Sequence, residues 1–119
     1  MTNVNRSTAC GNSPKNRMVE DIAVALESGD TRFLSAILDS GAIWNGADSG
    51  EVVGEDILSK LHGQGKQDVV TIDHVMSHGK VGAVNGHAKR GKIVQRFCHV
   101  IEFTSTKCNK IRRVESYRG

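Results

Sequence analysis

The sequence predicts an α+β fold in which three N-terminal helices pack on a cone-like, curved antiparallel β-sheet. Two observations predict it. Apolar residues recur at helical spacing through much of the first half of the chain, whereas strand-like alternation dominates from Asp68 onward. The length of 119 residues is typical of one domain with one hydrophobic core.

The first segment, residues 1–13, is rich in Asn, Ser, Thr and Gly and offers almost nothing to bury. Such a segment cannot offset the entropy lost on ordering, so we expect a flexible tail. The predicted single domain therefore spans residues 14–119.

Three helices are expected in the first half of that domain. The first begins at Pro14 and ends at Gly29, which is typical of a helix C-terminus. Asp30 is a natural N-cap for a second helix that ends near Gly41. The third spans Glu55 to His62, where an acidic first turn complements the helix dipole.

Four long strands joined by short turns are expected after the helices, following two short extended pieces at residues 42–45 and around Val52. The long strands are residues 68–78, 81–89, 92–104 and 110–117. Gly82 and Gly86 lie inside one of them, where glycine favours bulges or strong curvature. A sheet bent in this way can enclose a pocket against the helices.

Composition sets the class of protein and its expected location. The chain is 38% hydrophobic and 24% charged, with no apolar run near the ~18 residues of a membrane span and no signal-peptide pattern. We therefore expect a cytoplasmic protein with no membrane partner. Cys10, Cys98 and Cys108 match neither a disulfide framework nor a zinc knuckle, which predicts free thiols.

Charge is distributed unevenly along the chain. Residues 1–88 hold 7 basic and 11 acidic side chains, a net charge of −4, whereas residues 89–119 hold 9 basic and 2 acidic side chains, a net charge of +7. A basic surface of this kind attracts nucleic acid or an anionic ligand. Basic residues that alternate with apolar ones are also typical of a solvated sheet face, and we favour that interpretation over nucleic-acid binding.

Several local phrases resemble the nuclear transport factor 2-like superfamily, and within it the SnoaL-like proteins. They are Glu27-Ser28-Gly29-Asp30, Ala42-Ile43-Trp44, Val53-Gly54-Glu55, Phe97-Cys98-His99-Val100-Ile101-Glu102-Phe103, Lys110-Ile111 and Ser116-Tyr117. The resemblance implies a cone-shaped fold with a pocket between sheet and helices, and a homodimer formed through the outer sheet face. It does not imply one activity, because the superfamily includes polyketide cyclases, ketosteroid isomerases, dehydratases and interaction modules.

Two histidines are the predicted catalytic residues. Strand alternation groups His74 with Val70 and Ile72, and groups His99 with Phe97 and Ile101, so each imidazole interrupts an apolar face. An imidazole in such a cavity suits acid or base chemistry. The alternative is a histidine at the cavity rim that hydrogen-bonds a neighbour. Relatives often have a polar or acidic side chain at the pocket position that matches His99.

Four further residues are predicted ligand contacts. Asn85 can donate a hydrogen bond to a ligand oxygen, and Phe97 shares the face of His99. Trp44 and Tyr117 offer flat walls to an apolar ring, although core packing explains Trp44 equally well.

Carboxylate chemistry and metal binding lack support in the sequence. Asp73 falls on the strand face opposite His74, and Glu102 falls opposite His99, so neither pair shares a cavity unless a bulge intervenes. His74 and His78 lie about 13 Å apart on an extended strand, too far to share an ion. We expect neither a metal nor another cofactor.

The sequence therefore predicts a SnoaL-like protein with a pocket for a small apolar or polyketide-like molecule, of isomerase, cyclase or dehydratase type if it is an enzyme. The alternative is a non-catalytic homodimeric association or protein-interaction module. Whether the chain is an enzyme stays open at this point.

Overall fold

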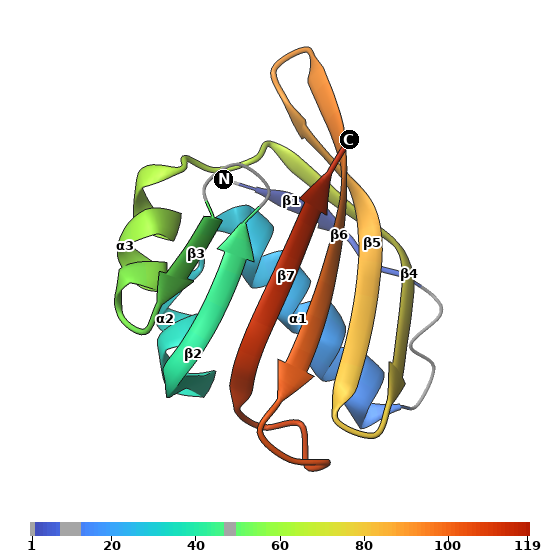
Figure 1. Ribbon diagram of the computed structural model, residues 1–119. Helices are drawn as coiled ribbons and strands as arrows, with labels where there is room; N and C mark the ends of the chain where they lie inside the picture. The colour runs from blue at the N-terminus through green and yellow to red at the C-terminus, as the bar shows by residue number, and fades with distance from the viewer. Residues whose placement is uncertain (1, 8–12, 47–49) are drawn as a thin grey trace.

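The computed structural model describes residues 2–7, 13–46 and 50–119, in which three helices cover one face of a curved sheet (Figure 1). The helices are α1 (Pro14–Ser28), α2 (Thr31–Ile37) and α3 (Asp56–Gly63). The strands are β1 (Asn3–Asn5), β2 (Leu38–Gly46), β3 (Gly50–Val53), β4 (Val69–His78), β5 (Val81–Arg90), β6 (Ile93–Phe103) and β7 (Ile111–Arg118). The α+β fold class is thus confirmed.

The sheet has the strand order β1-β4-β5-β6-β7-β2-β3. Its centre is the antiparallel meander of β4 to β7, as predicted. The other strands extend both edges: β1 runs parallel to β4, β2 runs parallel to β7, and β3 pairs antiparallel with β2.

The N-terminal segment differs from the predicted flexible tail wherever the structure describes it. Asn3–Asn5 form β1, and Arg6 makes ion pairs with Glu20 and Asp21 of α1 at 3.1 and 2.7 Å. Pairing with the edge of β4 supplies hydrogen bonds that the composition of this segment does not reveal. Residues 8–12 of the predicted tail, with Cys10, lie outside the described residues, and Cys98 and Cys108 are free thiols.

Local chemistry sets most of the helix ends. Ser13 caps α1 by accepting from the Asn16 amide, and Gly29 ends it in the left-handed region at φ 73°. Asp30 caps α2 as predicted, but α2 ends at Ile37 and not near Gly41, because β2 begins at Leu38 and pairs with β7. No helix in the described ranges combines the length and apolar character needed to cross a bilayer.

A bulge in β4 changes which residues face the helices. Ile72 pairs with Gly86 but His74 pairs with Asn85, so Asp73 is an extra residue. The next inward-facing residue after Ile72 is therefore Val75. His74 and Met76 are exposed on the outer face. The prediction that His74 faces inward is wrong for this reason, since strict alternation fails at a bulge.

Gly86 makes this bulge possible. A Cβ built on Gly86 would collide with the backbone carbonyl oxygen of Thr71 and lie 3.0 Å from the Phe97 ring. The predicted role of glycine in bending this strand is therefore supported by a close approach of two backbones.

The hydrophobic core lies between α1 and the inner face of the sheet. Its members from α1 include Val19, Ile22 and Leu26, whose spacings of three and four residues place them in one helical stripe. Of the residues predicted to face inward on β6, Phe97, His99, Ile101 and Phe103 are buried, whereas Ile93 at the start of the strand is 67% exposed. Two charged residues of α1, Glu20 and Glu27, are buried as well.

Candidate functional site

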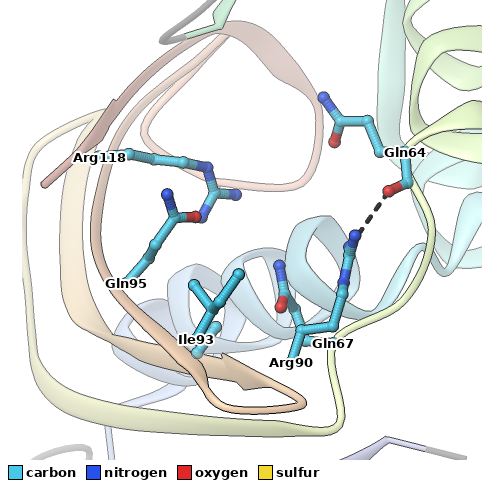
Figure 2. A pocket seen from close by; sticks show the side chains of 7 residues that line it. Gln64, Gln67, Arg90, Ile93, Gln95 and Arg118 are labelled. Atoms are coloured by element: carbon cyan, nitrogen blue, oxygen red, sulfur yellow. Dashed lines mark hydrogen bonds between the residues drawn. The ribbon is translucent and has the colours of Figure 1, made fainter.

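A cavity of about 300 Å³ opens where the loop after α3 faces the β5–β6 hairpin and the end of β7 (Figure 2). We call it the Arg118 cavity. Its lining consists of Gln64, Gln67, Ala88, Arg90, Ile93, Gln95 and Arg118. The volume is at the lower end of the ~300–1,000 Å³ typical of small-molecule sites.

The polar groups that line the Arg118 cavity are amides and guanidinium groups. Arg90 donates from Nη2 to the Gln64 carbonyl at 3.1 Å, which joins the hairpin to the loop after α3. The lining residues, all within the described part of the chain, include no carboxylate, imidazole, thiol or hydroxyl group. These walls can donate hydrogen bonds and balance negative charge, but they offer no ordinary general acid or base.

Arg118 is held at the cavity by a buried carboxylate. Its Nη2 donates to both carboxylate oxygens of Glu27, at 3.0 and 2.8 Å, and the Glu27 side chain has no exposed surface. Within the described structure, Nη1 of Arg118 is buried and has no hydrogen-bond partner. A buried donor left unpaired costs about 1–3 kcal/mol, so an acceptor that reached Nη1 would be favoured.

Glu27 also begins a hydrogen-bonded chain that crosses the inner face of the sheet. The His99 Nε2 lies 2.7 Å from Glu27 Oε2, its Nδ1 lies 2.7 Å from Ser116 Oγ, and Trp44 Nε1 donates to the same Oγ at 2.9 Å. An indole only donates, so Ser116 Oγ accepts from Trp44, and each ring nitrogen of His99 lies within hydrogen-bonding distance of one oxygen. We call Trp44, Ser116, His99, Glu27 and Arg118 the buried polar chain.

The ionisation of Glu27 follows from its partners. Burial raises the pKa of the Glu27 carboxyl, but hydrogen bonds and electrostatic attraction from His99 and Arg118 outweigh burial and leave that pKa below its usual value. Glu27 is therefore a carboxylate at neutral pH, and it fixes the position of the Arg118 guanidinium.

Three of the residues predicted from the sequence lie on the inner face, but none of them lines the Arg118 cavity. His99 is fully buried, Trp44 is 3% exposed and Phe97 is 2% exposed, with the Phe97 ring centroid 5.2 Å from that of His99. The buried polar chain joins Trp44 and His99 through Ser116, and Phe97 packs beside them.

The other three predicted residues share a hollow of about 370 Å³ that reaches the outer face of the sheet, and Phe97 and Arg118 line this hollow too. His74, Asn85 and Tyr117 are exposed there, and His74 Nδ1 lies 3.1 Å from Asn85 Oδ1. Strand pairing aligns them with Cys98 in one row across β4 to β7. The expectation that Asn85 and Tyr117 share a pocket with His99 is therefore wrong, because their strand positions point to the opposite face.

The sequence interpretation missed Glu27, Ser116, Arg118 and the three glutamines as site residues. Two signals were present. Glu27 lies four residues after Ala23 on the buried face of α1, and Ser116 follows inward-facing Val114 by two positions on β7. Neither signal reveals the partners, because Glu27 and Arg118 are 91 residues apart.

Comparison with known proteins identifies the fold. No family model matches the sequence, and no curated protein matches it. The structure is similar to a nuclear transport factor 2-like protein of unknown function from Burkholderia xenovorans LB400, with a TM-score of 0.69 and 19% identity over 87% of this chain and 83% of that one.

Two further similar structures bear names of enzymes. One is a candidate SnoaL-like polyketide cyclase from Shewanella putrefaciens CN-32, with a TM-score of 0.71 and 15% identity over 91% of this chain and 82% of that one. The other is an LEH-like epoxide hydrolase from M. tuberculosis, with a TM-score of 0.66 and 20% identity over 88% and 82% of the two chains. At these identities the shared property is the fold, which confirms the resemblance predicted from the sequence.

Proposed function

We propose that this chain, which has the fold of nuclear transport factor 2-like and SnoaL-like proteins, binds a small molecule in the Arg118 cavity without transforming it by acid–base chemistry. One observation carries the proposal. The Arg118 guanidinium lines the cavity, is fixed from behind by buried Glu27, and has hydrogen-bonding capacity left over at Nη1.

The buried polar chain supports binding because it positions Arg118 before a ligand arrives. Rigid groups lose little conformational entropy on binding, which raises affinity. Glu27 comes from α1, His99 from β6 and Ser116 from β7, so three elements hold one guanidinium in place. The amide-rich walls favour a ligand with polar groups over the mostly apolar molecule expected from the sequence.

The absence of an acid or base among the lining residues supports binding over catalysis. His99 and Glu27 of the buried polar chain are suited to proton transfer, but both side chains are fully buried and hydrogen-bonded to each other. A substrate in the cavity does not meet them. A general acid or base must reach hydrogen-bonding distance of the proton that it moves.

A fragment screen by two-dimensional amide NMR tests this proposal. We expect polar fragments to shift the amide signals of Gln67, Ala88 and Gln95 together. Arg90→Ala should weaken these shifts, whereas Lys89→Ala removes a charge from the adjacent exposed position outside the cavity lining and should not. Binding confined to the outer hollow, or no binding by any fragment, would contradict the proposal.

A second candidate function is self-association through the outer sheet face, as the resemblance implies. Met76 and Tyr117 are 63% and 58% exposed on that face, near the half-buried Ala83 and Val100. Exposed apolar side chains that gather on one sheet face are typical of an interaction surface.

Sedimentation velocity tests the second candidate. A natural chain that is dimeric and a Met76→Glu variant that is monomeric would support it, since the new charge would be buried between the two copies. The control is Val53→Glu, which changes an apolar side chain of similar exposure, 52%, on edge strand β3. If the chain stays monomeric at concentrations up to about 1 mM, this function is ruled out. A dissociation constant of about 1 mM corresponds to a binding free energy of only about 4 kcal/mol.

A further inference from the structure

We infer that the ligand of the Arg118 cavity carries a carboxylate, which is held between the guanidinium groups of Arg118 and Arg90. This inference rests on the proposed function and adds the chemical class of the ligand. In Figure 2 the Arg118 side chain extends into the cavity from the left and the Arg90 side chain rises at the lower right, with Ile93 between them.

The charge of the cavity selects the class of ligand. The lining residues carry two positive charges, on Arg90 and Arg118, and no negative charge. Glu27 lies behind Arg118 and offsets one of them, whereas Arg90 hydrogen-bonds a neutral carbonyl and keeps its charge. The remaining charge of about +1 matches a monoanion such as a carboxylate better than it matches a phosphate dianion.

The hydrogen-bonding geometry of Arg118 also favours a carboxylate ligand. A guanidinium presents its donors as a planar fork, and Glu27 occupies only Nη2. Nη1 belongs to the same fork and lacks an acceptor within the described structure. A carboxylate oxygen is the acceptor that forms the shortest and strongest bonds with such a group.

Gln95 is the neighbour of Arg118 that can complete the carboxylate site. Figure 2 shows the Gln95 side chain beside the Arg118 guanidinium at the same wall. Gln95 is exposed, and within the described residues its amide group makes no hydrogen bond that would hold it there. Its side chain is therefore free to change rotamer and to donate to the second carboxylate oxygen.

Benzoate, benzamide and phenyl phosphate test the inference, because they share a ring and differ in the polar head. Their dissociation constants are measured by amide NMR titration of the full chain in one buffer. We expect benzoate to bind at least about tenfold more tightly than neutral benzamide, since bonds between charged groups are the stronger ones. Phenyl phosphate should bind no more tightly than benzoate.

Three variants locate the effect. Arg90→Gln should reduce benzoate affinity about tenfold and leave benzamide almost unchanged, whereas Lys89→Gln removes the same charge one residue away and should change neither. Arg118→Lys keeps the charge that pairs with Glu27 but removes the fork, so benzoate affinity should fall about tenfold as well. The thermal unfolding of each variant is recorded to confirm that it is folded.

The outcomes distinguish a failure of the carboxylate inference from a failure of the proposed binding function. If benzamide or another neutral fragment binds in the cavity as tightly as benzoate, the carboxylate inference is wrong and the proposed function stands. If Lys89→Gln weakens benzoate as much as Arg90→Gln does, general surface charge explains the binding and the inference is again wrong. If no fragment of any class binds in the cavity, both the inference and the proposed function are wrong.

Discussion

The two faces of the sheet place histidine side chains in opposite environments. On the inner face, His99 is fully buried between Glu27 and Ser116, and each of its ring nitrogens has a partner at 2.7 Å. On the outer face, His74 is exposed and has one neighbour, Asn85, at 3.1 Å. A histidine on this sheet is therefore a structural component on one face and a solvated surface group on the other.

The difference shows that burial decides how much a polar group contributes to the stability of the fold. The buried polar chain holds a carboxylate, that of Glu27, which water cannot reach, so each member depends on the next. The outer row can exchange its partners for water at little cost. The inner face should thus respond strongly to single substitutions, and the outer face should tolerate them.

Glu27→Ala should have the largest effect on stability. It leaves Arg118 and His99 without their shared partner in a buried setting, and breaking a buried pair in this way costs about 3–5 kcal/mol. The free energy of unfolding in urea measures the loss. The control is Glu102→Ala on the outer face of β6, where we expect a change within about 0.5 kcal/mol. Equal losses in the two variants would contradict the contrast between the faces.

Gly86→Ala should rank second, because it acts on the bulge that separates His74 from the inner face. The new methyl group would overlap the Thr71 carbonyl oxygen, and overpacking of this kind costs about 1–3 kcal/mol. Gly63→Ala serves as the control, since a Cβ there meets no atom within 4 Å. Chemical denaturation of both variants measures the difference. An unchanged midpoint for Gly86→Ala would show that the two backbones are not in close contact.

The dependence of stability on pH should identify the Glu27 carboxylate. Because its pKa is lowered in the folded state, its contribution is fully present above the unfolded value of about 4.3 and is lost as the pH falls through the lower folded value. The difference in unfolding free energy between the natural chain and Glu27→Gln should therefore be constant from pH 7 to about pH 5 and shrink below pH 4. A difference that grew on acidification would have the wrong sign for this account.

His74→Ala should have the smallest effect of the four. An exposed imidazole with one hydrogen-bonded neighbour contributes within about 0.5 kcal/mol. His99→Ala provides the comparison, because it leaves Glu27 and Ser116 without the imidazole that joins them. Thermal unfolding of the two variants at one pH measures the contrast. A loss at His74 as large as that at His99 would show that the outer row is a structural element too.

Interactions that are local in the sequence were predictable, and those between distant segments were not. Gly29 and Asp30 mark helix ends through their own backbone and side-chain chemistry, and both were correctly assigned. The inner face of β6 followed from simple alternation. Asn3–Asn5 form a strand only because the edge of β4 is present to pair with them, which no local pattern reveals.

The candidate site was predicted less well for the same physical reason. His99 was predicted as a polar group on an inward face and Trp44 as a flat wall for a ligand, but the partners that define their role come from α1 and β7. His74 was misplaced by one extra residue, Asp73, whose presence as a bulge depends on Gly86 in the next strand. Arg118 was counted only as part of a basic surface, since nothing near it in the sequence indicates a buried carboxylate.

The separation of Glu27 from its partners also bears on synthesis by the ribosome. His99 follows Glu27 by 72 residues and Arg118 follows it by 91. The ribosome adds about 5–20 residues per second, so both partners of the Glu27 carboxylate have been made roughly 5–18 s after Glu27 itself. During that interval the Glu27 carboxylate has neither His99 nor Arg118 as a partner, and burying a carboxylate unpaired is unfavourable. The cavity therefore forms only once β6 and β7 have joined the sheet.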